Sequence, residues 1–244
     1  MLVVLALMVA TSFLSGIFGM AGGLILIGVL LALLPVPEAM ALHAVTQMAA
    51  NGWRGVLWWK HVRWRAALTF LAGAAVAFAV WSLWRYVAPK PLALLLLGIS
   101  PFLVRLFPAD LKPNAERLPD GLLYGSGSMS LMLTAGVSGP LIDTFFLGGT
   151  LERRQIVATK SICQLFCHGM KFLYFGSVIE QAASVDPIMA GAAIAASIVG
   201  TTAARPILDR LTDTQYRLWA NRIVTTIAVV YLVQGGALLL WPRA

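Results

Sequence analysis

Apolar residues form runs of helix length along most of the chain, and two glycine-rich segments interrupt these runs at similar places in its two halves. The first break, residues 16–23, reads Gly-Ile-Phe-Gly-Met-Ala-Gly-Gly, and the second break, residues 136–140, reads Gly-Val-Ser-Gly-Pro. Backbone that leaves helical geometry inside lipid exposes N–H and C=O groups, which is tolerated only where protein or a water-filled cavity receives them. Each break therefore predicts two short helices that meet inside a membrane protein.

The apolar runs predict five helices in each half of the chain, with the same order of short and long pieces. The expected ranges are 2–15, 21–34, 38–59, 66–86 and 91–107, then 120–135, 140–149, 152–178, 187–207 and 215–241. A polar, proline-containing segment separates the halves. We therefore expect a first transmembrane repeat at 1–107, a cytoplasmic linker at 108–118 and a second, inverted repeat at 119–244.

Short sequence matches support an internal duplication. Residues 72–77, Ala-Gly-Ala-Ala-Val-Ala, resemble residues 190–195, Ala-Gly-Ala-Ala-Ile-Ala. Residues 44–47, Ala-Val-Thr-Gln, resemble residues 157–160, Val-Ala-Thr-Lys. Because the matches occur in the same order as the breaks and helices, duplication is the simplest interpretation.

Composition decides the class of protein. Hydrophobic residues make up 59% of the 244 residues and charged residues 11%, which is too apolar for a soluble domain. The net charge of +8 does not indicate a nucleic-acid partner, because the basic residues are dispersed among short loops. We predict an all-α polytopic protein of the bacterial inner membrane, surrounded by the lipid bilayer.

The positions of Lys and Arg favour a re-entrant hairpin at the second break. If each break lay within one full crossing, the basic loop residues would divide about evenly between the two faces. If the second break is the tip of a hairpin, only Arg85, Lys90 and Arg243 lie outside, as the positive-inside rule favours. Each half would then hold a hairpin plus three transmembrane helices, an odd number that inverts one half relative to the other. The hairpin at the first break is inferred from the repeat.

Several of these segments also carry a family resemblance. The first break continues as Gly19-Met-Ala-Gly22-Gly23-Leu-Ile-Leu, the second contains Gly136-Val-Ser-Gly139, and Ala-Val-Thr and Val-Ala-Thr segments follow them. Over essentially its full length the chain resembles the TauE/SafE family of bacterial sulfite and organosulfonate exporters. The resemblance implies export of a small anion such as sulfite or sulfoacetate across the inner membrane.

The two breaks are the first candidates for a substrate site. A helix that begins after each break would direct unpaired N–H groups and a positive dipole end toward the membrane interior, where an oxyanion can accept them. Glycine lets the anion approach the backbone closely. The candidates are Gly19, Gly22, Gly23, Gly136, Ser138 and Gly139. The alternative is that these glycines only permit close helix packing.

Two polar stripes follow the breaks with identical spacing, so each lies on one face of its helix. They consist of His43, Gln47, Asn51 and Arg54, and of Lys160, Gln164, His168 and Lys171. A polar stripe facing lipid would be unfavourable, so both are expected to face the interior. We expect anion contacts near mid-membrane from Thr46, Gln47 and Asn51, which would lie opposite Thr159, Lys160 and Gln164. Lys160 would compensate the charge of the anion.

Other interpretations of the same residues remain open. Thr46 and Thr159 would serve equally well as interhelical hydrogen-bonding groups. Arg54 and Lys171 lie nearer opposite membrane surfaces, where their side chains could extend to the headgroups.

Three titratable residues are candidates for coupling transport to an ion gradient. His43 and His168 could relay protons, or each could be a hydrogen-bonded structural residue. Asp143 could complement a helix N-terminus or act as a protonatable carboxylate. Cys163 and Cys167 are interpreted as packing residues, so no metal site and no cofactor is predicted.

An enzyme is the main rival class. Gly136-Val-Ser138-Gly139 fits the Gly-x-Ser-Gly pattern of rhomboid intramembrane proteases, with His168 as a conceivable base. The equivalent position in the first half is Gly19-Met-Ala-Gly22, which lacks the serine, so we predict a transporter and no enzymatic activity. A membrane assembly subunit is a third possibility, and a homodimer is a plausible state of a compact carrier.

Overall fold

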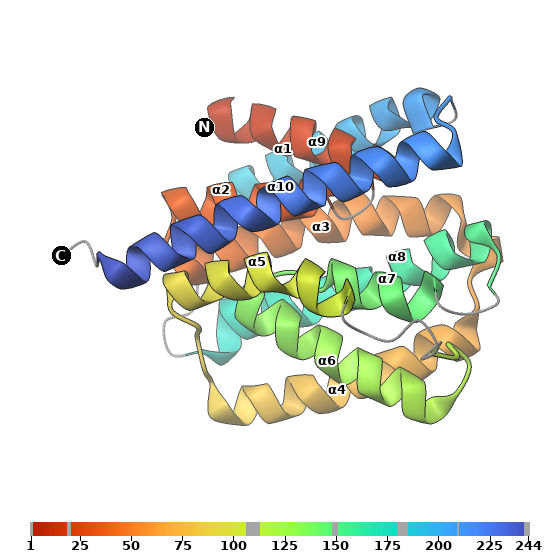
Figure 1. Cartoon of the computed structure of the whole chain (residues 1–244), viewed down its shortest axis with the longest axis horizontal. Helices are drawn as coiled ribbons and strands as arrows, with labels where there is room; N and C mark the ends of the chain where they lie inside the picture. Colours follow the sequence, from red (N-terminus) through yellow and green to blue (C-terminus); the bar gives the residue numbers. More distant parts are fainter. Residues whose placement is uncertain are drawn as a thin grey trace.

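The computed structural model describes residues 2–18, 21–105, 113–147, 151–179, 185–208 and 210–241, and these residues contain helices and no strand (Figure 1). The helices are α1 (Leu2–Phe18), α2 (Ala21–Leu33), α3 (Val36–Leu57), α4 (Trp64–Trp84), α5 (Lys90–Arg105), α6 (Leu118–Ala135), α7 (Gly139–Leu147), α8 (Arg153–Leu173), α9 (Pro187–Leu208) and α10 (Asp213–Leu240). A 3₁₀ turn, Trp59–His61, follows α3, and a π-helical turn, Tyr174–Val178, follows α8. The protein is thus all-α, as predicted.

Each of the ten predicted helices is present, with small differences at the ends. α3 begins at Val36, two residues before the predicted start, and includes Pro37 in its first turn. A proline is compatible with the first turn of a helix, because the N–H that it lacks has no partner within the helix there. The predicted start after the proline was therefore too late.

The second break is built by Gly136, which ends α6. Its φ of +89° lies in the left-handed region that favours glycine, and its N–H donates to the Met132 carbonyl over 3.1 Å. α7 then begins at Gly139, after a gap of two residues from Gly136. At the first break, α1 ends at Phe18 and α2 begins at Ala21, so the candidate Gly19 lies outside the described residues.

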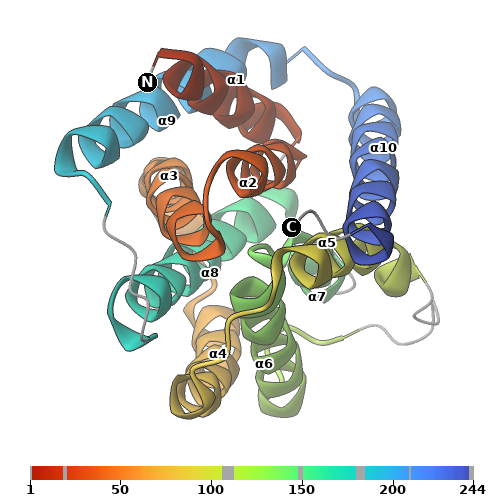
Figure 2. The ribbon, with the colours of Figure 1, turned by 90° about the vertical axis from the view of Figure 1, so that its left-hand side faces the viewer.

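Helices of the first half pack against helices of the second half (Figure 2). α3 packs on α8 and α5 on α10, while α1 packs on α9 and α4 on α6. Gly52 lies against Leu165 and Gly55 against Ile162, so α3 and α8 run antiparallel. Antiparallel packing of helices that hold the same place in each half is the geometry expected of an inverted repeat. The duplication itself stays a prediction.

Both ends of the α6–α7 hairpin lie at the end of the molecule formed by the α3–α4 connection. Glu116, just before α6, forms an ion pair with Arg63. Arg154, after α7, lies over the Trp58 ring with its Cζ 5.8 Å from the ring centroid. The second break is therefore the tip of a hairpin that enters and returns at one end, as the charge distribution predicts.

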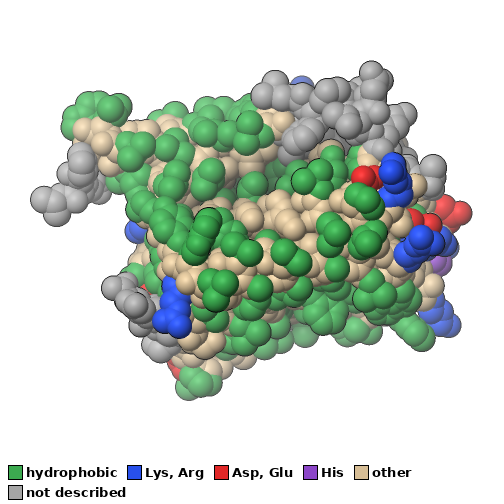
Figure 3. Space-filling view, turned by 90° about the horizontal axis from the view of Figure 1, so that it is seen from below, with side chains coloured by type: hydrophobic (Ala, Val, Ile, Leu, Met, Phe, Trp, Pro, Cys, Tyr) green, Lys and Arg blue, Asp and Glu red, His purple; other side chains and the backbone are tan. Residues whose placement is uncertain are grey.

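Apolar side chains cover much of the outer surface, whereas charged side chains gather toward the two ends (Figure 3). Within the described residues, three helical stretches are long and apolar enough to cross a membrane: Trp64–Trp84, Pro187–Ala204 and Leu218–Leu240. α3 and α8 fail this criterion because their polar stripes lower their hydropathy. Both helices pack on each other and against several further helices (Figure 2).

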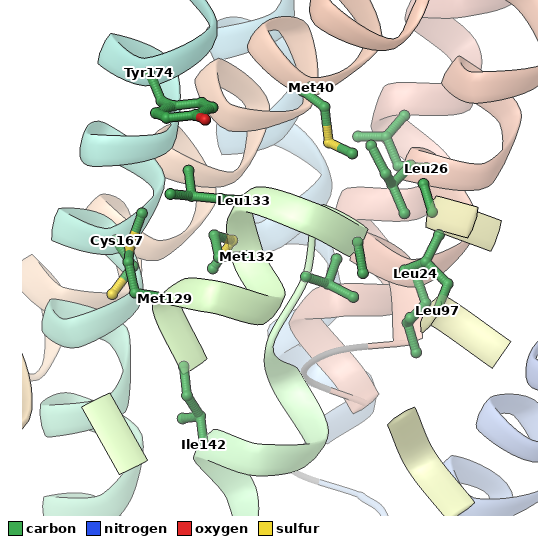
Figure 4. Close-up of a cluster of buried hydrophobic side chains, with 14 of the residues drawn as sticks. Leu24, Leu26, Met40, Leu97, Met129, Met132, Leu133, Ile142, Cys167 and Tyr174 are labelled. Carbon is green, nitrogen blue, oxygen red and sulfur yellow. The ribbon is translucent and has the colours of Figure 1, made fainter. Parts of the chain in front are cut away.

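One apolar cluster joins the two halves beside the breaks. Figure 4 shows side chains from α2, α3, α5, α6, α7 and α8 converging in it, among them Leu24, Met40, Leu97, Met132, Ile142 and Cys167. These side chains are almost fully buried. The cluster fixes the tips of both hairpins against the central helices and so positions the polar residues at the breaks.

Candidate functional site

The residues around the breaks enclose a small cavity where α2, α3, α7 and α8 meet. Its volume is about 20 Å³, which is room for about one water molecule. It is lined by Gly23, His43, Gln47, Val137, Ser138, Gly139, Gln164 and His168. All of these except Val137 are candidates from the sequence. The structure therefore brings together both breaks and both polar stripes at one place.

Three polar atoms of the residues that line this cavity are buried and lack a hydrogen-bond partner among the described residues. They are Nε2 of Gln47, Oγ of Ser138 and Nδ1 of His168. Leaving a buried polar group without a partner costs about 1–3 kcal/mol, so buried groups normally find one. A polar molecule in this cavity would therefore meet three atoms that have no partner in the described chain.

The start of α7 adds a favourable field for an anion. The Ser138 carbonyl accepts the first hydrogen bonds of the helix, from the N–H groups of Leu141 at 3.1 Å and Ile142 at 3.0 Å. Ser138 therefore stands at the N-terminus of α7, where the helix dipole favours negative charge. Its hydroxyl does not cap the helix, since it has no partner in the described part of the chain, and remains available to a ligand.

Lys171 lies in a different place from the one predicted. Its side chain is fully buried rather than near a membrane surface. The Nζ donates to the Gly136 carbonyl over 2.9 Å and contacts Nδ1 of His43 at 2.9 Å. Lys171 lies in the last turn of α8, but this turn packs against the second break, which offers the Gly136 carbonyl, and so does not reach a membrane surface.

His43 connects this lysine to the first break. Its Nε2 lies 3.0 Å from the Gly23 carbonyl, which can only accept, so Nε2 carries the hydrogen and Nδ1 accepts from Lys171. The ring also lies beside that of His168, with the centroids 5.4 Å apart. A continuous chain of hydrogen bonds thus runs from Gly23 through His43 and Lys171 to Gly136.

Lys160 is paired with Asp143, and neither residue lines the cavity. Both side chains are partly buried, with 13% of the lysine and 23% of the aspartate exposed. Asp143 therefore neutralises the charge that was expected to compensate the anion. The pair joins α7 to α8 on the side of the cavity that faces the α3–α4 connection.

Thr46, Thr159 and Asn51 are not among the residues that line the cavity. The Thr46 hydroxyl donates to the Leu42 carbonyl at 2.8 Å, and Asn51 Nδ2 donates to the Gln47 carbonyl at 2.9 Å. Thr159 Oγ1 accepts from the Arg63 backbone N–H at 3.0 Å and so connects α8 to the residue that precedes α4, whereas the Thr46 hydroxyl bonds within its own helix rather than between helices. Since Gly52 lies against Leu165 in antiparallel helices, Thr46 and Thr159 lie on opposite sides of this contact, each roughly 9 Å from it along its helix.

Two further candidates have packing contacts. Gly22 lies against the Thr11 carbonyl and Ser15, so close that a side chain at this position would collide with α1. This is the close-packing role that was weighed against binding. The guanidinium of Arg54 donates to the Ser15 carbonyl at 3.2 Å and so holds α3 to α1.

Cys163 and Cys167 are buried free cysteines. The described residues contain no group of three His, Cys, Asp or Glu side chains that could hold a metal ion. The Lys171 network is the part of the site that sequence reasoning missed. Lys171 follows His168 on the same helical face, and this spacing was the one feature of the sequence that could have placed Lys171 at the site.

The fold and the site together define a polytopic membrane protein with a polar centre at the tips of two broken helical hairpins. The family described as Sulfite exporter TauE/SafE matches residues 3–232, and the chain belongs to this family. Its members are transporters rather than enzymes, in agreement with the predicted class. Neither a curated protein nor a solved structure matches the chain.

Proposed function

We propose that the protein exports a small sulfur-containing or organic anion, such as sulfite or sulfoacetate, across the bacterial inner membrane by alternating access. The family supports a sulfur oxyanion as the substrate class. The observation that carries the proposal is the set of three unpaired polar atoms, on Gln47, Ser138 and His168, around one cavity.

The chemistry of the cavity suits an oxyanion. Gln47 Nε2 and the Ser138 hydroxyl are donors, and the N-terminus of α7 adds its positive dipole end at Gly139. Hydrogen bonds to a charged group contribute about 1.5–3 kcal/mol each, so a few of them give useful affinity without holding the anion too tightly for release. Gln164 and Gly23 complete the wall.

Transport requires the cavity to open, since a space for one water molecule is too small for sulfite. In our proposal the two inverted halves expose the site to each side in turn, with one hairpin entering from each face of the membrane. Lys160 meets the anion on the cytoplasmic side when its pair with Asp143 opens. Thr46, Asn51 and Thr159 support the two central helices.

The proposal includes the location, the partners and the assembly of the protein. The protein is a multi-pass inner-membrane carrier that needs the bilayer and a small anion as partners, no nucleic acid and no cofactor, and it assembles as a homodimer. The protease alternative receives no support from the site. Among the described residues Ser138 Oγ lacks a hydrogen-bond partner, so His168 does not activate it.

Flux into proteoliposomes containing only the purified protein tests the proposal. The panel should include sulfite, thiosulfate, sulfoacetate, simple carboxylates and chloride. We expect uptake of sulfur oxyanions, and a Ser138→Ala variant with weaker apparent affinity. Ser128→Ala is the matched control, because Ser128 on α6 also has a buried hydroxyl without a partner in the described chain but does not line the cavity. No flux of any anion, or equal effects of both substitutions, would refute the proposal.

A further inference from the structure

Lys171 is a fully buried lysine that holds both breaks together, directly through the Gly136 carbonyl and through His43 to the Gly23 carbonyl. We infer that Lys171 and His43 form a proton site that is charged while the cavity holds an anion, so that one proton crosses the membrane with each anion. This inference rests on the proposed function and adds its coupling ion.

The surroundings of Lys171 contain few charges. Within the described chain no carboxylate pairs with it, and its two polar partners are a neutral ring nitrogen and a carbonyl. α2 has no titratable residue, and those of α4 and α6 lie in their first two turns, away from the second break. The remaining titratable groups nearby are His43 on α3 and His168 and Cys167 on α8. The Tyr174 hydroxyl donates to backbone carbonyls, and Asp143 on α7 is paired with Lys160.

An ammonium buried without a counter-ion is unfavourable, because two neutral acceptors replace only part of its hydration. An anion in the cavity, on the other side of the His43 ring, would supply the negative charge that the Lys171 ammonium lacks. Anion binding and proton binding therefore favour each other, and the coupling must be reciprocal. The empty carrier returns without the charge, and the loaded carrier holds a proton and an anion together.

His43 gives the proton a path. Its ring contacts Lys171 through Nδ1 and also lines the cavity. On uptake, water in the compartment that the opened cavity faces gives a proton to Nε2 of His43, and the ring passes its Nδ1 hydrogen to the Lys171 amine, which restores the contacts described above. On release to the other compartment both steps reverse: Lys171 returns a hydrogen to Nδ1, and Nε2 leaves the Gly23 carbonyl and gives its hydrogen to water. Each N–H bond that forms is matched by one that breaks, and no oxidant or reductant is needed.

A pair of lysine-to-arginine substitutions tests this assignment. Arginine stays charged under all conditions in proteins, so Lys171→Arg keeps a positive charge but cannot release the proton. Lys60→Arg makes the same change at an exposed lysine in the 3₁₀ turn after α3, away from the cavity. The apparent affinities for methanesulfonate and sulfite would be measured across the neutral pH range by anion exchange in proteoliposomes. Titration of sulfite itself affects all variants equally.

For the wild type and Lys60→Arg we expect affinity to fall as pH rises, by up to about tenfold per pH unit for one linked proton. Lys171→Arg should lose this pH dependence while still binding the anion. A pH-sensitive dye inside the vesicles should report proton movement with the anion in the wild type and none in Lys171→Gln. Folding of each variant is checked by its thermal unfolding midpoint, and His43→Gln serves as a second uncoupled variant.

The outcomes separate the inference from the proposed function. If the wild type carries no anion, the proposed function fails. If it carries anions without protons, or if Lys171→Arg and His43→Gln keep the wild-type pH dependence, the function stands and the proton site is wrong.

Discussion

Gly22 and Gly23 are neighbours at the start of α2, and the structure predicts opposite consequences for the same substitution. A methyl group on Gly23 would stand 3.3 Å from Oε1 and 3.4 Å from Cδ of Gln47, the side-chain amide that lines the cavity. The amide must shift by a few tenths of an ångström to make room. A methyl group on Gly22 would collide with the Thr11 carbonyl and the Ser15 backbone, which cannot move without shifting α1.

The magnitudes follow from these contacts. Gly23→Ala disturbs one hydrogen bond to a charged ligand, which is worth about 1.5–3 kcal/mol and corresponds to roughly a tenfold to hundredfold loss of anion affinity. Its stability should stay near that of the wild type, since replacing glycine in a helix by alanine gains about 0.5–1 kcal/mol. Gly22→Ala should instead lose about 1–3 kcal/mol of stability through overpacking.

The assay combines sulfite exchange in proteoliposomes with the midpoint of thermal unfolding in detergent. We expect Gly23→Ala to show weak substrate affinity and a normal midpoint, and Gly22→Ala to show a lowered midpoint. Unchanged sulfite affinity in Gly23→Ala would refute the assignment of the cavity as the anion site.

Four further substitutions test three separate parts of the structure. Gly136→Ala places a side chain in the left-handed region at a cost of about 1–2 kcal/mol, and a normal unfolding midpoint would contradict the described end of α6. Lys160→Met leaves Asp143 partly buried and unpaired and should lower the midpoint, which Asp143→Asn in the same chain should restore; failure of this rescue would show that the pair contributes little. Tyr231→Phe removes the hydrogen bond to the Leu24 carbonyl and should cost about 0.5–1.5 kcal/mol in an unfolding titration; no change would argue against that contact.

Much of the architecture was predictable because it depends on local patterns. The second break stops a helix where Gly136 permits a left-handed turn, and apolar runs extend until polar loops end them. The hairpin at the second break was also predictable, since membrane orientation depends on where basic residues lie. Proline in a first turn was the exception, because Pro37 is compatible with either side of the helix start.

The candidate site was predictable in its location and only partly in its residues. One cavity is lined by seven of the predicted residues: Gly23, His43, Gln47, Ser138, Gly139, Gln164 and His168. Pairing could not be read from the helical face alone: Asp143 neutralises Lys160, while Lys171 has no carboxylate partner in the described chain. Both facts depend on how α7 and α8 cross, which is decided by contacts between residues far apart in sequence.

The central claim is that the two breaks hold the transported anion between them. Selenite has the shape of sulfite, and its selenium can be located by anomalous scattering in crystals of the protein. The account predicts a selenium position within hydrogen-bonding reach of Gln47 Nε2, the Ser138 hydroxyl and the start of α7, which is lost in Ser138→Ala and kept in Ser128→Ala. Selenium bound instead at the Lys160–Asp143 pair, with the cavity between the breaks empty, would contradict it.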